Sequence, residues 1–289
     1  MEEVFKTCTA KEDRMKFANY LENLLACKKE EIQQLIQDTQ RDPQHHLNRI
    51  LHQEHICQER FLKALKSPGL SIIGEIKRES PTCGKIRHID DPAKFALQYC
   101  QGGASAISVL TDMQGFGGSL KDMHRVSKIL NQSYPEVAIL RKDFILHSLQ
   151  LAEAVFYGAH AVLLIVGVVG SNLKPLLQDA QRLGLDVLTE VHDLPELELA
   201  LEAGAKIIGM NHRNLKRFTI DLEVSEKLKP YIPEGVVTVA ESGIHNPMQA
   251  EKIRKMGCDG ILIGEALVKA QNPSQLIKQM KGETGEDEG

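Results

Sequence analysis

The segment AVLLIVGVVGSNLKPLLQDAQRLGLDVLT, residues 161–189, contains the pattern that decides the fold. It begins with the apolar run AVLLIV, residues 161–166, and ends with the β-rich run DVLT, residues 186–189. Between these runs, residues 173–183 repeat leucine and alanine at helical spacing. A short apolar strand, a helix and a second strand make one unit of a parallel sheet. The segment therefore predicts a βαβ unit.

The same alternation runs from residue 71 to residue 280. β-rich runs are predicted at 71–76, 105–110, 137–140, 161–166, 186–189, 206–210, 236–240 and 260–263. Helical patterns are predicted between them at 93–101, 120–130, 149–157, 173–183, 194–203, 221–228 and 247–256, and closing helices at 265–270 and 273–280. The strands are apolar on both faces, as expected when helices cover the outside of a sheet.

Eight repeats favour an α/β fold of the closed (β/α)₈ type, a TIM barrel, over an open doubly wound sheet. An open sheet that binds nucleotides carries a glycine-rich fingerprint after its first strand, and neither GxGxxG nor GxxxxGK[ST] occurs in this chain. We expect an N-terminal helical extension over residues 1–68, the barrel over 69–280 and an acidic, disordered tail over 281–289. In the extension, amphipathic patterns predict helices over about residues 12–39 and over 47–65, with Lys28–Glu31 on a polar face.

The composition is that of a globular protein without a nucleic-acid or membrane partner. The chain has 289 residues, 42% of them hydrophobic and 26% charged, and a formal net charge of −4. No apolar run has the ~20 residues that a transmembrane helix needs, and the N-terminus lacks the features of a secretory signal. The six cysteines contain no Cys-x-x-Cys, and the histidines near residue 50 lack zinc spacing, so we expect reduced thiols, no metal and a cytoplasmic location.

Polar side chains stand where the predicted strands end. Glu75 and Lys77 stand at the end of the first strand, Lys142 follows the third, Glu190 the fifth and Asn211 the sixth. In a barrel these strand ends meet at one mouth, and burying unpaired polar groups there costs several kcal/mol each. Such groups would therefore not be expected at these positions if they served only to stabilise the barrel. Together they predict an active site.

The last two strands carry a second signal. Ser242 and Gly243 follow the seventh strand, and Gly264 follows the eighth just before a predicted helix. Glycines let backbone N–H groups approach an anion, and the loops after strands seven and eight form the usual phosphate site of this fold. We therefore expect a small phosphorylated substrate.

At these positions the sequence resembles indole-3-glycerol phosphate synthase over residues 20–280. The motifs occur in order: Glu75–Pro81 (EIKRESP), Leu110–Asp112 (LTD), Phe116–Ser119 (FGGS), Arg141–Phe144 (RKDF), Leu188–Val191 (LTEV), Gly209–Leu215 (GMNHRNL), Ala240–Ile244 (AESGI) and Leu262–Glu265 (LIGE). The resemblance implies a carboxy-lyase of tryptophan biosynthesis. The reaction closes the indole ring of 1-(2-carboxyphenylamino)-1-deoxyribulose 5-phosphate with loss of CO₂ and water, and uses neither metal nor organic cofactor.

The resemblance also implies roles for the residues at the strand ends. Lys142 matches the general acid, and Lys77 a second lysine near the substrate carboxylate or active in dehydration. Glu190 matches a base or electrostatic stabiliser, Glu75 a carboxylate that orients Lys77, and Asn211 a residue that holds the substrate hydroxyl. We expect the chain to act as a monomer or a weak homodimer.

Nine further residues complete the predicted substrate site. The phosphate is expected at Ser80, Ser242, Gly243 and Gly264, the anthranilate ring between Phe116 and Phe144, with Arg213, Glu241 and Glu265 nearby. Glu265 stands where the family often has serine, so its carboxylate must point away from the phosphate. Cys83 is unusual for the loop after the first strand.

Two other functions fit a phosphate-binding barrel. The related phosphoribosylanthranilate isomerase uses a cysteine and an aspartate as acid and base, and that pair is absent from the corresponding strand ends. A non-catalytic scaffold predicts relaxed catalytic positions, whereas Lys77, Lys142 and Glu190 are all present. The synthase is therefore the favoured reading.

Overall fold

The computed structural model describes residues 2–53, 55–56, 58–81, 84–215 and 219–283, with only the backbone described for residues 2–19. Cys83 and the tail from residue 284 onward lie outside these ranges. Within them, no helix combines the length and apolar character that crossing a membrane requires.

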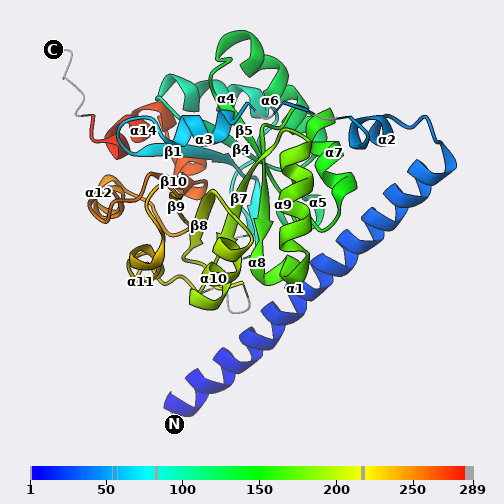
Figure 1. The fold of residues 1–289 in the computed structure, drawn as a ribbon. Helices are drawn as coiled ribbons and strands as arrows, with labels where there is room; N and C mark the ends of the chain where they lie inside the picture. The colour runs from blue at the N-terminus through cyan, green and yellow to red at the C-terminus, as the bar shows by residue number, and fades with distance from the viewer. Residues whose placement is uncertain (1, 54, 57, 82–83, 216–218, 284–289) are drawn as a thin grey trace.

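Eight parallel strands of the described chain close into a barrel (Figure 1). They are β1 (Ser71–Ile76), β4 (Ala106–Leu110), β5 (Ala138–Lys142), β6 (Ala161–Ile165), β7 (Asp186–Val191), β8 (Ile207–Asn211), β9 (Val237–Glu241) and β10 (Gly260–Ile263). Their order around the barrel is β1-β10-β9-β8-β7-β6-β5-β4, so the first and last barrel strands pair with each other. The predicted (β/α)₈ barrel is confirmed.

Helices surround this sheet on its outer side (Figure 1). They are α4 (Pro92–Gln101), α6 (Leu120–Ser133), α7 (Ser148–Phe156), α9 (Leu173–Arg182), α10 (Leu194–Glu202), α11 (Val224–Leu228), α12 (Pro247–Lys255), α13 (Glu265–Lys269) and α14 (Pro273–Lys281). Side-chain caps start several of them, as Asp91, Ser119 and Asp193 accept hydrogen bonds from backbone N–H groups of the first turn. Short elements lie in the loops: β2 (Glu79–Ser80), β3 (Gly84–Lys85), α5 (Met113–Phe116), α8 (Val166–Val169) and the 3₁₀ turns η1 (Gly170–Asn172) and η2 (Lys229–Tyr231).

The predicted helix over residues 221–228 is too long. α11 begins at Val224, because the residues before it pair with the chain that follows β8. Ile220 forms an antiparallel bridge with Arg213, and the N–H of Asp221 donates to the carbonyl of His212 at 2.8 Å. This pairing holds the loop close to the end of β8.

The apolar core has two layers that share the sheet. Ile73, Leu140 and Leu188 belong to the cluster inside the barrel, whereas Ile72, Ile139 and neighbouring apolar residues pack between the sheet and the outer helices. The alternation of side chains along a strand produces this division. Both faces of each strand are therefore buried, in agreement with the apolar runs of the sequence.

The N-terminal extension forms three helices, α1 (Glu2–Arg41), α2 (His46–Leu51) and α3 (Arg60–Leu65). The single helix predicted over residues 47–65 is wrong, since the chain leaves the helical path between α2 and α3. There the N–H of His55 donates to the carbonyl of Arg182 at 3.0 Å, and Glu59 has a φ of 49°. The segment between α2 and α3 therefore runs past the end of α9 before it reaches the barrel.

α3 closes the amino-terminal end of the barrel, and α1 crosses the other end (Figure 1). Phe61 and Leu65 of α3 are fully buried and belong to the cluster inside the barrel. The N–H groups of Phe61 and Leu62 donate to Oδ2 of Asp186, the first residue of β7, at 2.9 and 3.1 Å. Asp186 thus satisfies two of the free N–H groups at the start of α3.

Phe61→Ala tests this closure. Removing a fully buried aromatic side chain leaves a cavity at the barrel end, so we expect the free energy of unfolding to fall by about 3–5 kcal/mol with little change in KM. Chemical denaturation measures the first and steady-state kinetics the second. Ile56→Ala, at a side chain that is 91% exposed, is the control. A Phe61 variant as stable as this control would contradict the role of α3.

Candidate active site

A cavity opens at the carboxyl ends of the barrel strands. Its volume is about 1100 Å³, including the open mouth, and each of the eight strands contributes at least one wall residue. The floor carries the carboxyl groups of Glu75, Glu190 and Glu241 and the amino groups of Lys77 and Lys142. This is the mouth at which barrel enzymes place their chemistry.

The cavity contains all the residues that the sequence analysis assigned to the site. They are Glu75, Lys77, Ser80, Phe116, Lys142, Phe144, Glu190, Asn211, Arg213, Glu241, Ser242, Gly243, Gly264 and Glu265. Four strands, β5, β7, β8 and β9, run one or two residues beyond their predicted ends and so include Lys142, Glu190, Asn211 and Glu241. Strand geometry, not loop conformation, therefore sets the positions of these four side chains.

One wall of the cavity comes from α1, which the sequence analysis did not assign to the site. Leu21 and Leu24, from its apolar face, line the cavity. Lys28, expected on a polar face, is instead only 3% exposed. The spacing in the sequence could have indicated this burial. Lys28 follows Leu21 and Leu24 by seven and four residues, so it lies on the same face of the helix.

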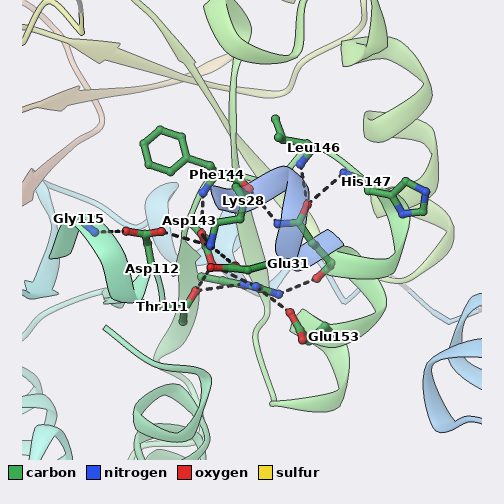
Figure 2. A network of polar contacts seen from close by, with 12 residues as sticks. Lys28, Glu31, Thr111, Asp112, Gly115, Asp143, Phe144, Leu146, His147 and Glu153 are labelled. Atoms are coloured by element: carbon green, nitrogen blue, oxygen red, sulfur yellow. Dashed lines mark hydrogen bonds and ion pairs between the residues drawn. The ribbon is translucent and has the colours of Figure 1, made fainter. Parts of the chain in front are cut away.

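Lys28 joins α1 to a buried polar network beside the mouth (Figure 2). Its Nζ lies 3.2 Å from Oδ1 of Asp112, 3.0 Å from Oδ1 of Asp143 and 2.7 Å from Oε2 of Glu31. On its far side Asp143 pairs with Arg141 at 3.1 Å. Burial alone would raise the pKa of Asp143, but Arg141 and Lys28 lower it, so the carboxylate is ionised.

Lys28→Met should release α1 from the mouth. The change leaves the carboxylates of Asp112 and Asp143 buried without this partner, at a cost of about 3–5 kcal/mol. We expect KM to rise with the fraction of molecules in which α1 is detached, because Leu21 and Leu24 then leave the cavity wall. Steady-state kinetics measures KM, and Lys29→Met, at an exposed neighbour, is the control. An unchanged KM in the Lys28 variant would contradict this role.

Lys142 lies at the centre of the floor. Its Nζ is 3.2 Å from Oε2 of Glu190 and 3.5 Å from Oε2 of Glu241. Asn211 fixes the other oxygen of Glu190, since its Nδ2 donates to Oε1 at 2.9 Å. The Oδ1 of the same amide accepts a hydrogen bond from the N–H of Arg213. Lys142, Glu190 and Asn211 thus form one connected group.

The charges of this group follow from its burial and its contacts. Burial alone would lower the pKa of Lys142, but Glu190, Glu241 and Glu75 together raise it above the ordinary value. Burial would raise the pKa of Glu190, but Lys142 and the hydrogen-bond donors around that carboxylate lower it. Lys142 is therefore protonated and Glu190 ionised at neutral pH.

Glu241 behaves differently from Glu190. Its side chain is 1% exposed, and neither carboxylate oxygen has a hydrogen-bond partner among the described residues. Burial, with Glu190 and Glu75 nearby, outweighs the attraction of Lys142 and raises the pKa of Glu241 to about 8. Gly209 makes room for this carboxyl group, because a Cβ at that position would lie 2.1 Å from its Oε1. Glu241 is therefore mainly protonated at neutral pH.

Glu241→Gln should change how stability depends on pH. Between about pH 4.5 and 8, native Glu241 keeps a proton that the unfolded chain has lost, so its contribution to stability falls as pH rises. Glutamine removes this dependence. We expect the variant to gain at least about 1 kcal/mol on the wild type between about pH 5 and pH 8.

Denaturant unfolding of both proteins at the two pH values measures this gain. Glu234→Gln, at an exposed carboxylate, is the control and should keep a constant difference from the wild type. A pH-independent difference for the Glu241 variant would show that Glu241 is ionised in the native protein.

Lys77 and Glu75 form a second ion pair on the floor, with Nζ and Oε1 2.8 Å apart. Burial would raise the pKa of Glu75, but Lys77 and Lys142 lower it. Gly264 allows this arrangement, because a Cβ there would lie 2.5 Å from Oε1 of Glu75. Gly264, which was predicted to bind the phosphate, thus also leaves space for the carboxylate of Glu75.

A strained turn follows β9 at the rim of the cavity. Ser242 has a φ of 68° and Gly243 a φ of 76°, and only the glycine adopts such a value readily. His212 supports the turn, since its Nδ1 lies 2.8 Å from the carbonyl oxygen of Ser242. Across the rim, Oε1 of Glu265 pairs with Lys269 one helical turn away at 2.6 Å. The carboxylate of Glu265 is thus engaged along α13.

Solved structures with the same fold act on other substrates. Thiamine phosphate pyrophosphorylase from Pyrococcus furiosus is 20% identical, with a TM-score of 0.57 over 74% of this chain and 94% of that one. N-acetylmannosamine-6-phosphate 2-epimerase from Clostridium perfringens is 16% identical, with a TM-score of 0.56 over 79% of this chain and 98% of that one. At such identities the likeness shows the barrel fold alone.

Other proteins share a much higher sequence identity with this chain. The indole-3-glycerol phosphate synthase of a Nocardioides species is 44% identical over 218 residues, which are 75% of this chain and 82% of that protein. The synthase of Thermoanaerobacter pseudethanolicus is 42% identical over 226 residues, 77% of this chain and 85% of that protein. The family model described as indole-3-glycerol phosphate synthase matches residues 21–280, which include the cavity-lining part of α1 and the whole barrel. The chain therefore belongs to the indole-3-glycerol phosphate synthase family.

Proposed function

We propose that this chain converts 1-(2-carboxyphenylamino)-1-deoxyribulose 5-phosphate into indole-3-glycerol phosphate, CO₂ and water. The family is one of carboxy-lyases in tryptophan biosynthesis. The observation that carries the proposal is the position of protonated Lys142, 3.2 Å from the carboxylate of Glu190, on the floor of the cavity. A proton donor and a carboxylate at this spacing can serve both bond formation and dehydration.

In the first step, the ring carbon that bears the carboxylate forms a bond to the ribulose carbonyl carbon. Lys142 donates its proton to the carbonyl oxygen, where negative charge develops. Its raised pKa ensures that the proton is present at neutral pH. The bond to CO₂ then breaks, and its electron pair restores the aromatic ring.

In the second step, the new hydroxyl leaves as water and the neighbouring carbon loses a proton. Glu190 stabilises the positive charge that develops as the hydroxyl leaves, or accepts the proton. Asn211 holds the departing hydroxyl, and the ammonium group of Lys77, paired with Glu75, donates the proton with which that hydroxyl leaves as water. Both steps proceed with acids and bases of the chain itself.

The rim and the walls are assigned to binding. Ser80, the Ser242–Gly243 turn and the backbone of Gly264 are proposed to bind the phosphate, and Phe116 and Phe144 to pack against the anthranilate ring. Glu241, as a neutral carboxyl group, can donate a hydrogen bond to the substrate. Arg213 adds positive charge on the same side of the cavity.

We propose a cytoplasmic protein, active as a monomer or a weak homodimer, that needs no metal or organic cofactor. An assay of indole fluorescence with EDTA present tests the last point together with the reaction itself. Loss of turnover in EDTA with recovery on adding a metal would contradict it.

Lys142→Ala is the decisive variant. We expect kcat to fall by about 100-fold or more with the substrate Kd nearly unchanged, as for the loss of a general acid. Single-turnover formation of the indole measures the rate, and fluorescence titration the affinity. Lys255→Ala, at a side chain that is 74% exposed, should leave both unchanged. An unchanged rate in the Lys142 variant would remove it from this role.

A further inference from the structure

His192 follows β7 and contacts Glu190 from behind the cavity. The two residues are two positions apart, so strand alternation directs both side chains to the same side. Nε2 of His192 lies 3.3 Å from Oε1 of Glu190, although it is not aligned as a hydrogen bond. The side chain is 12% exposed and does not line the cavity.

Glu196 contacts the other ring nitrogen of His192. Its Oε2 lies 2.9 Å from Nδ1 and also accepts a hydrogen bond from the N–H of His192 at 2.9 Å. Glu196 is itself fixed at the start of α10, where Asp193 caps its N–H. Gly167 leaves space for it, since a Cβ there would lie 2.4 Å from its Oε1. The sequence E-x-H-x-x-x-E, residues 190–196, encodes this arrangement.

These contacts extend the charged floor of the cavity outward. Acidic and basic groups alternate from Glu196 through His192 and Glu190 to Lys142. Burial alone would lower the pKa of His192, but Glu190 and Glu196 raise it to about 10. From β9, Glu241 also interacts with this imidazole. His192 is thus a cation at neutral pH.

We propose that His192 is a positioning residue, which holds the carboxylate of Glu190 ionised and aimed at Lys142 through an ion-pair chain anchored by Glu196. The inference rests on the proposed function, in which Glu190 takes part in the reaction. Two buried carboxyl groups flank Lys142, and only Glu190 has the imidazolium against it. His192, together with the hydrogen bond from Asn211, therefore favours ionisation of Glu190 over ionisation of Glu241.

His192→Gln keeps a polar side chain and removes the charge. Glu190 then loses a cation, so its pKa rises and the acidic limb of the pH profile of kcat/KM moves to higher pH. We expect the single-turnover rate at the pH optimum to fall by about 10-fold or more because Glu190 is no longer held toward Lys142, with KM changed by less than about twofold. Glu196→Gln should shift the same limb in the same direction, and it serves where the His192 variant does not fold.

His160→Gln is the matched control, because this half-buried histidine contacts Arg60 at the amino-terminal end of the barrel. It should leave the pH profile unchanged whatever its stability. A His192 variant that loses stability and keeps the wild-type profile would overturn the inference. NMR titration gives an independent test: an imidazole of His192 that titrates near its ordinary value of ~6.5 would also overturn it.

Glu190→Gln separates this inference from the proposed function. A Glu190 variant with wild-type turnover would overturn the catalytic role of Glu190 and the inference with it. A Glu190 variant without turnover, beside His192 and Glu196 variants with the wild-type pH profile, would overturn only the role of His192. Loss of turnover in the first and a shifted profile in the other two supports both.

Discussion

Lys142 is held among the carboxyl groups of Glu75, Glu190 and Glu241, with its side chain 14% exposed. Taking such charges out of water costs several kcal/mol per ion, and only well-placed partners offset that cost. The barrel provides such partners because the carboxyl ends of its strands all lie around the same mouth. Gly209 and Gly264 give two of the carboxyl groups the space that they need. The barrel therefore brings together a cluster of charged side chains that come from four different strands.

The two ends of the barrel are closed by the same N-terminal extension in different ways. At the amino-terminal end α3 supplies fully buried apolar side chains, which serve stability. At the mouth α1 supplies Leu21, Leu24 and the buried charge of Lys28. The buried ammonium group of Lys28 needs both carboxylates within ion-pair distance, so it restricts the position of α1 more than the apolar contacts alone. The extension thus belongs to the site as much as to the core.

The periodicity of apolar residues was sufficient to predict the barrel and the level at which its polar groups meet. It placed the ends of β5, β7, β8 and β9 too early, because charged and polar side chains replace apolar ones in the last residues of these strands. It also misjudged Lys28, whose burial depends on Asp112 and Asp143, which follow β4 and β5 and are far from Lys28 in the sequence. The break between α2 and α3 was hidden for the same reason, since the contact with Arg182 that stabilises it is not local. Local patterns cannot report partners that only the folded chain brings together.

The different protonation of Glu190 and Glu241 on the floor also depends on residues that are distant in the sequence. Glu190 and Glu241 both lie within 3.5 Å of Lys142, and sequence alone gives no reason why they should differ. Asn211 donates a hydrogen bond to Glu190, and the imidazole of His192 lies 3.3 Å from the same carboxylate, whereas Glu241 has no hydrogen-bond partner among the described residues. A neutral carboxyl beside an ionised one gives the cavity a donor and an acceptor of the same residue type. Since the environment and not the residue type sets this difference, the protonation of each carboxyl group depends on residues behind the cavity as well as on those that line it.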